Sequence, residues 1–145
     1  MKIKEIIELY NAIKNAKLTK LSTSEKVQII KTASTLSPIA AQWDEFIKTV
    51  YDKCKGENHD AYMSDLQQWQ HEGEKTTLSI ERRIAISQYM NKYNEETEKI
   101  INERKNEDVS LDLCQIDEEA FNKLIDSNEF DIETAMPIYT AIVKK

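Results

Sequence analysis

The chain has 145 residues, and its 40% of apolar residues is enough for one hydrophobic core of ordinary domain size. Two glycines and two prolines exclude the turn-rich all-β classes, and the abundance of Glu, Lys, Ile and Ala favours helices. The net charge of −6 is unevenly distributed, since residues 1–35 carry +4 and residues 106–136 carry −9.

The first two expected helices cover residues 2–16 and 23–36. A helix over residues 2–16 would have one apolar face, which consists of Ile3, Ile6, Ile7, Tyr10 and Ile13. Ser22 and Glu25 fit a capping box that opens the second helix. The apolar face of that helix is predicted to consist of Val27, Ile30, Ala33 and Leu36.

A third helix is expected over residues 38–55, with its own start and stop signals. Ser37 suits the N-cap, Pro38 the first turn, and Gly56 a left-handed residue just past the end. Spacings of three and four residues give one apolar face, made of Ile39, Trp43, Phe46, Ile47, Val50 and Cys54. We predict that Trp43, Phe46, Ile47 and Val50 are mostly buried against the first two helices, in a compact antiparallel unit.

The middle of the chain is more polar. A short helix near 60–72 is expected to end at Gly73, and its Trp69 either lies under a loop or anchors a partner. A long helix near 79–106 follows, although residues 76–80 could instead be a strand. Its apolar face is narrow and suits one partner helix, which another chain could supply; it contains Ile86, Met90, Tyr93, Thr97 and Ile100.

Residues 109–116 alternate between apolar and polar side chains, which predicts a short strand or an extended arm. Asp117 should cap a small helix that ends near Ser127, and a last helix should follow that Pro137 bends or splits. The apolar face of the last helix contains Ile132, Met136, Tyr139, Ile142 and Val143. The predicted fold is therefore mostly α, a single domain over 1–145 with a helical core in 1–56 and a more polar, partner-binding extension in 57–145.

The residues needed for the common chemistries are missing or scattered. Gly56 and Gly73 are too far apart for a phosphate-binding loop. The two histidines and two cysteines show no metal-ligand or disulfide spacing, and the expected apolar position of Cys54 makes its thiol inert. We therefore expect no enzyme activity, cofactor, metal or small-molecule substrate.

The sequence also restricts the cellular location and the class of binding partner. No signal peptide or membrane span is visible, so a soluble protein made in the cytoplasm and not secreted is expected. Nucleic acid is a disfavoured partner, because the 110 residues after the basic N-terminal part sum to −10. Other proteins, copies of this chain among them, are the expected partners. The candidate contact residues are Trp69, Ile86, Met90, Tyr93, Ile100, Lys14, Lys17 and Lys20.

The order of features resembles a known group. A basic opening helix, helices ending in QWDEFIKTVYDKCKG, a long helix and the arm VSLDLCQIDEEAFNKLID are similar to small helical proteins of uncharacterised role encoded in tailed-phage and mobile-element genomes. The resemblance implies a non-enzymatic structural or assembly protein, such as a head–tail connector, ring, tail or capsid-accessory component of a virion. The alternative is an intracellular regulator that binds a host protein or nucleic acid through the basic N-terminal helices.

Overall fold

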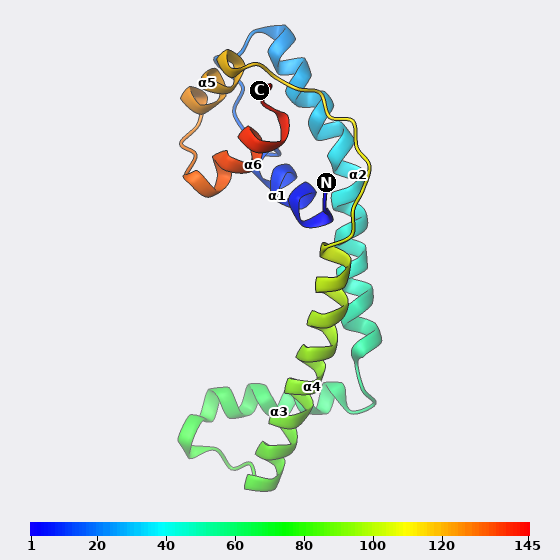
Figure 1. The fold of residues 1–145 in the computed structure, drawn as a ribbon. Coiled ribbons are helices and arrows are strands. Elements are labelled where there is room, and N and C mark those ends of the chain that lie inside the picture. Colours follow the sequence, from blue (N-terminus) through cyan, green and yellow to red (C-terminus); the bar gives the residue numbers. More distant parts are fainter. The chain divides into compact units, whose positions relative to one another are not determined.

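The computed structural model describes residues 1–145 and shows an all-α protein of six helices without strands (Figure 1). The residues divide into two compact units, unit 1 (Met1–Glu45 and Arg104–Lys145) and unit 2 (Phe46–Glu103). The helices are α1 (Ile3–Ile13), α2 (Thr23–Cys54), α3 (His59–Glu72), α4 (Ile80–Lys105), α5 (Glu118–Ser127) and α6 (Ile132–Ile142), with a 3₁₀ turn η1 at Gly73–Lys75.

Side-chain oxygens accept backbone amides at the start of several helices. The Glu25 amide donates to the Ser22 hydroxyl at 3.2 Å, and the Ser22 amide donates to the Glu25 carboxylate at 2.9 Å, so the predicted capping box is confirmed. The Asp117 carboxylate accepts from the Ala120 amide at 2.8 Å, which confirms the predicted cap of α5. Asp131 caps α6 in the same way.

The two helices predicted over 23–36 and 38–55 are one continuous helix, α2, so the predicted break and the Ser37 cap are wrong. Pro38 lies inside the helix and cannot donate to the carbonyl of Ser34. Both residues are exposed, so water can satisfy that carbonyl. Leu36 and Ala40 are buried on either side of the proline, and this burial outweighs the lost hydrogen bond.

The N-terminal part of α2 buries only part of the predicted face, since Leu36 is fully buried and Ala33 packs against the core. Val27 is 42% exposed and Ile30 is 54% exposed, whereas Ile29 and Thr32 are buried. The Thr32 hydroxyl is satisfied by the Cys114 carbonyl at 3.1 Å, which lets a polar residue occupy the core. The helical period was therefore predicted correctly, and the buried face is rotated so that Ile29 and Thr32 replace Val27 and Ile30.

The core of unit 1 joins the two ends of the chain. Helices α1, α5 and α6 pack with the first part of α2, and the segment between α4 and α5 covers them (Figure 1). The buried members are Ile6, Leu9, Ala12, Ile13, Leu21, Ile29, Leu36, Ile116, Ala120, Leu124, Ile138, Ile142 and Val143. This division of the chain differs from the predicted core in 1–56 and extension in 57–145, because residues 116–143 supply six of the thirteen buried core residues.

Backbone hydrogen bonds also hold both termini in unit 1. The Val109 amide donates to the Met1 carbonyl at 2.8 Å. The Ile116 amide donates to the Ile142 carbonyl at 2.8 Å, and the Lys144 amide donates back to Ile116. Residues 109–115 form an arm without helix or strand, so of the two predicted forms the extended arm is present and the strand is not.

Unit 2 contains the end of α2, α3, η1 and α4. Helix α3 ends at Gly73, whose φ of 60° is the left-handed conformation, so this stop signal is confirmed. The predicted long helix is confirmed as α4, and residues 76–79 are irregular rather than a strand. Gly56 was predicted to be left-handed and is not. A Cβ there would lie 3.3 Å from the Tyr89 ring, so the glycine instead permits close approach of that side chain.

The predicted burial of the third apolar face is confirmed for one residue, and the other three are covered less completely. Of the four residues named for it, Val50 is buried, whereas Trp43, Phe46 and Ile47 are half-buried. Phe46, Ile47 and Val50 belong to unit 2, which has fewer buried side chains than unit 1.

Candidate protein-binding surfaces

Two of the predicted contact residues on α4 are buried inside unit 2. Ile86 and Tyr93 lie in its core, and the Tyr93 hydroxyl donates to the Tyr51 carbonyl of α2 at 3.2 Å. Burial raises the pKa of the Tyr93 phenol. The helix that Tyr93 contacts thus belongs to the same chain. Met90 is half-buried and Ile100 is exposed, so these two retain surface that a partner could contact.

A cluster of aromatic side chains connects α3 to α4. The His59 imidazole forms a hydrogen bond with the Tyr89 hydroxyl, which also accepts from the Gly56 amide at 3.2 Å. The Tyr62 ring stacks on Tyr89 with the ring centres 4.6 Å apart, and the Arg82 guanidinium lies 4.4 Å above Tyr62. The polar atoms of this cluster bond to one another, which fixes the two helices.

The arginine of this cluster also forms an ion pair with an acidic side chain of α3. The Arg82 guanidinium donates to the Asp65 carboxylate at 2.7 Å, and this hydrogen bond raises the pKa of Arg82. No group of three or more His, Cys, Asp or Glu side chains is arranged to hold a metal ion. The sequence analysis did not predict the cluster, although Tyr89 and Tyr93 stand one helical turn apart.

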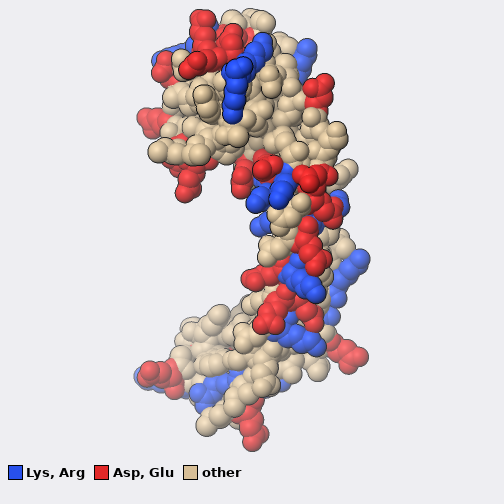
Figure 2. Space-filling model, in the orientation of Figure 1, with Lys and Arg blue, Asp and Glu red and all other residues tan.

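Trp69 lies at a shallow groove between α3 and α4, with a volume of about 330 Å³. Ile80 and Ile84 line the groove and are 67% and 52% exposed. Arg83 also lines it, and its Nε is buried without a hydrogen-bond partner. The face of α3 in view carries few charged side chains (Figure 2). This groove is an apolar surface that a protein partner could cover, and the contact role of the half-buried Trp69 stays a prediction.

The predicted basic contact residues, Lys14, Lys17 and Lys20, lie in and beside the turn after α1. Their side chains are exposed and make no ion pair. The backbone of this turn is bound to the end of α5, since the Lys17 amide donates to the Asn128 side chain at 2.8 Å and the Lys20 amide donates to the Ser127 hydroxyl at 3.1 Å. The three lysines are therefore held in place, with their charges directed to solvent.

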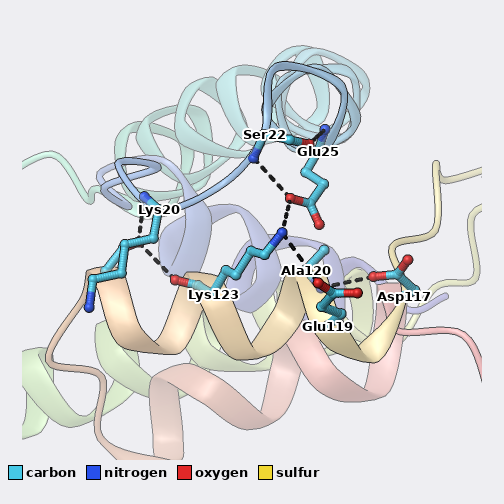
Figure 3. A network of polar contacts seen from close by, with 8 residues as sticks. Lys20, Ser22, Glu25, Asp117, Glu119, Ala120 and Lys123 are labelled. Atoms are coloured by element: carbon cyan, nitrogen blue, oxygen red, sulfur yellow. Dashed lines mark hydrogen bonds and ion pairs between the residues drawn. The ribbon is translucent and has the colours of Figure 1, made fainter.

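Only one ion pair joins the basic N-terminal segment to the acidic C-terminal segment. Lys123 lies 2.9 Å from Glu25 and 3.6 Å from Glu119 (Figure 3). Hydrogen bonds from the Ser22 amide and from Lys123 hold the pKa of the Glu25 carboxyl below its usual value, and the bond to Glu25 raises the pKa of Lys123. The acidic residue of this pair comes from the basic segment, and the lysine comes from the acidic segment.

A larger groove lies between α1 and α6 in unit 1, with a volume of about 910 Å³. Its lining is acidic and apolar: Met1, Glu5, Glu8, Asn11, Ala12, Glu133, Thr134, Met136, Pro137, Thr140 and Ala141. Glu5 accepts the Lys2 amide at the start of α1, and no lysine or arginine pairs with Glu5, Glu8 or Glu133. The negative charge of this groove is thus unneutralised by the chain itself.

The exposed side of α6 adds apolar surface beside that groove. Ile132 is 75% exposed and Met136 is 59% exposed, and both lie with Tyr139 on one face of the helix. The sequence periodicity placed these residues together with Ile142 and Val143, which are buried. Periodicity identifies a face but not its direction, so the exposed part of this surface was missed.

No helix of the structure is both long enough and apolar enough to cross a membrane. Comparison of the chain with protein-family models, curated proteins and solved structures finds no match. The surfaces described above are therefore the basis for any functional conclusion.

Proposed function

We propose that this protein is a non-enzymatic structural or assembly protein that works by packing against other proteins. The observation that supports this proposal is the exposure of large apolar side chains in each unit, Ile132 and Met136 on α6 and Ile80 and Ile84 on α4. Exposed side chains of this kind mark protein interfaces when they gather on one surface. In both places they line or border a groove, which is where partner side chains can be buried.

The setting proposed for this activity is a virion or another multi-subunit particle of a tailed phage or mobile element. This part rests on the resemblance of the order of features to such proteins. The regulator alternative would use the exposed Lys14, Lys17 and Lys20 on a host protein or nucleic acid instead.

The test is the size of the complex that contains the chain in extracts of the cells or particles that produce it. We expect the wild-type chain to migrate with a larger assembly. Two single variants, Met136→Glu and Ile84→Glu, should be tested separately. Met136→Glu places a charge in the exposed apolar surface of unit 1 and Ile84→Glu places one in that of unit 2, and neither removes a buried contact. At least one should shift the chain toward the monomer.

The control is Lys48→Glu, an exposed charge change outside the two grooves. A wild-type chain that migrates as a monomer in the native extract would contradict the proposal. Retention on duplex DNA at physiological salt, lost on replacing Lys14, Lys17 and Lys20 by Glu, would favour the regulator alternative.

A further inference from the structure

We propose that the α1–α6 groove of one copy binds the exposed face of α2 from a second copy, so that the protein assembles head to tail. This inference rests on the proposed function and names the partner for one of its surfaces. The exposed α2 face is defined here as Val27, Ile30, Lys31 and Ser34, which lie on one side of the helix at spacings of three and four residues. Both surfaces belong to unit 1.

The charges of the two surfaces are complementary. The groove carries Glu5, Glu8 and Glu133 without a basic partner. The α2 face carries Lys31, which is exposed and makes no ion pair within the chain, and Lys26 lies one residue from Val27. Ile30, Lys31 and Ser34 also line a third groove together with Asp112, but Lys31 forms no ion pair with this acid. Opposite charges that are unused within each copy can therefore pair between copies.

The lengths of the two surfaces also correspond. From Val27 to Ser34 the α2 face extends about 10 Å, at roughly 1.5 Å per residue. The groove residues on α1 from Glu5 to Ala12 cover an equal number of residues, hence a similar length of about 10 Å. An exposed helix with two apolar side chains can lie in the groove between two other helices, with its apolar residues against Met136 and its lysines toward the acidic walls.

The two surfaces that meet in this contact are different parts of the chain, and this determines the symmetry of the assembly. The groove is formed by α1 and α6, whereas the face that enters it lies on α2, so the two halves are different surfaces of the chain. A contact between different surfaces leaves one free groove and one free α2 face at the ends of every open oligomer. Growth then continues until a ring closes or a filament forms.

The test is sedimentation velocity of the purified full chain over a range of concentrations and salt. We expect the wild type to form oligomers that weaken as salt rises, because exposed ion pairs are screened. Loss of two exposed ion pairs should weaken association by up to about 25-fold, at roughly fivefold for each pair. A wild-type chain that stays a monomer from low to high salt overturns this inference, whereas the proposed function survives if the native extract still contains an assembly.

Two variants identify the surfaces. Ile30→Glu blocks the α2 face, and Met136→Glu blocks the groove; both positions are exposed, and circular dichroism will verify that the variants fold. Each variant alone should be a monomer. Mixed together they should form a 1:1 heterodimer that does not grow, because the first retains an intact groove and the second an intact α2 face.

Ile84→Glu is the matched control, since it makes the same change at an equally exposed residue of unit 2. It should assemble like the wild type. Self-association by either blocked variant, or failure of the mixture to form the heterodimer, overturns the inference. So would loss of assembly in the control together with normal assembly of the Ile30 and Met136 variants, which would place the contact on unit 2.

Discussion

Truncation of Ile142 tests whether the C-terminal helix completes the core of unit 1. Ile142 is fully buried among residues of α1 and α5, and its carbonyl accepts the Ile116 amide. Replacing it by Ala removes three carbon atoms, which is about 2.4 kcal/mol of transfer free energy at roughly 0.8 kcal/mol per carbon. The cavity left behind increases the expected loss to about 2–5 kcal/mol.

The assay uses the fact that each unit contains one tryptophan, Trp43 in unit 1 and Trp69 in unit 2. In a Trp69→Phe background, fluorescence during thermal unfolding reports on Trp43. Ile142→Ala should then lower the unfolding temperature of unit 1 by roughly 10–40 °C, given about 4–8 °C per kcal/mol for a unit of this size.

Met136→Ala is the control on the same helix, and its side chain is exposed, so it should change stability little. If Ile142→Ala is as stable as this control, the C-terminal helix does not complete the core and the first 56 residues fold independently, as the sequence alone predicted.

Three other changes have definite expected outcomes. Thr32→Val should lower the free energy of unfolding by about 1–3 kcal/mol because it leaves the Cys114 carbonyl without its donor, and Thr32→Ser should be milder; urea denaturation measures both. Pro38→Ala should raise the free energy of unfolding by up to about 3 kcal/mol, since the helix continues through this position; a decrease would show that the proline is required. Glu25 has a pKa below its ordinary 4.5, so its contribution is complete above that pH and is lost as the pH falls through the lowered pKa. Glu25→Gln should therefore reduce the loss of thermal stability between about pH 6 and pH 2.

Local signals in the sequence predicted helix ends well. The Ser22 capping box, the Asp117 cap and the Gly73 stop each depend on residues within one turn, and the structure confirms all three. Their energies arise from hydrogen bonds and backbone conformations that do not require the rest of the chain. There are two exceptions: Gly56 is not left-handed, and at Pro38 the local preference to end a helix was overcome by burial of Leu36 and Ala40 on the same helix.

Tertiary position was the harder part. The sequence showed that α2 has apolar residues at helical spacing, but Ile29 and Ile30 are neighbours and only packing with the C-terminal helices decides that Ile29 is buried. The α1–α6 groove illustrates the same limit, because Glu8 and Glu133 come from opposite ends of the chain. Of the predicted contact residues, the structure left Trp69 and Ile100 partly exposed and buried Ile86 and Tyr93.

The net charge of a sequence segment also does not predict the net charge of a surface of the folded protein. The Glu25–Lys123 pair uses one residue of the minority sign from each segment, so the remaining residues of 1–35 sum to +5 (seven Lys against two Glu) and those of 106–136 to −10. Helical spacing then directs Glu5 and Glu8 into the groove with Glu133, whereas Lys31 faces outward on α2. Folding therefore leaves the larger part of both charges unpaired and separates them onto different faces. The head-to-tail contact would bring these faces together between copies, and its expected weakening by salt follows from the exposure of every group involved.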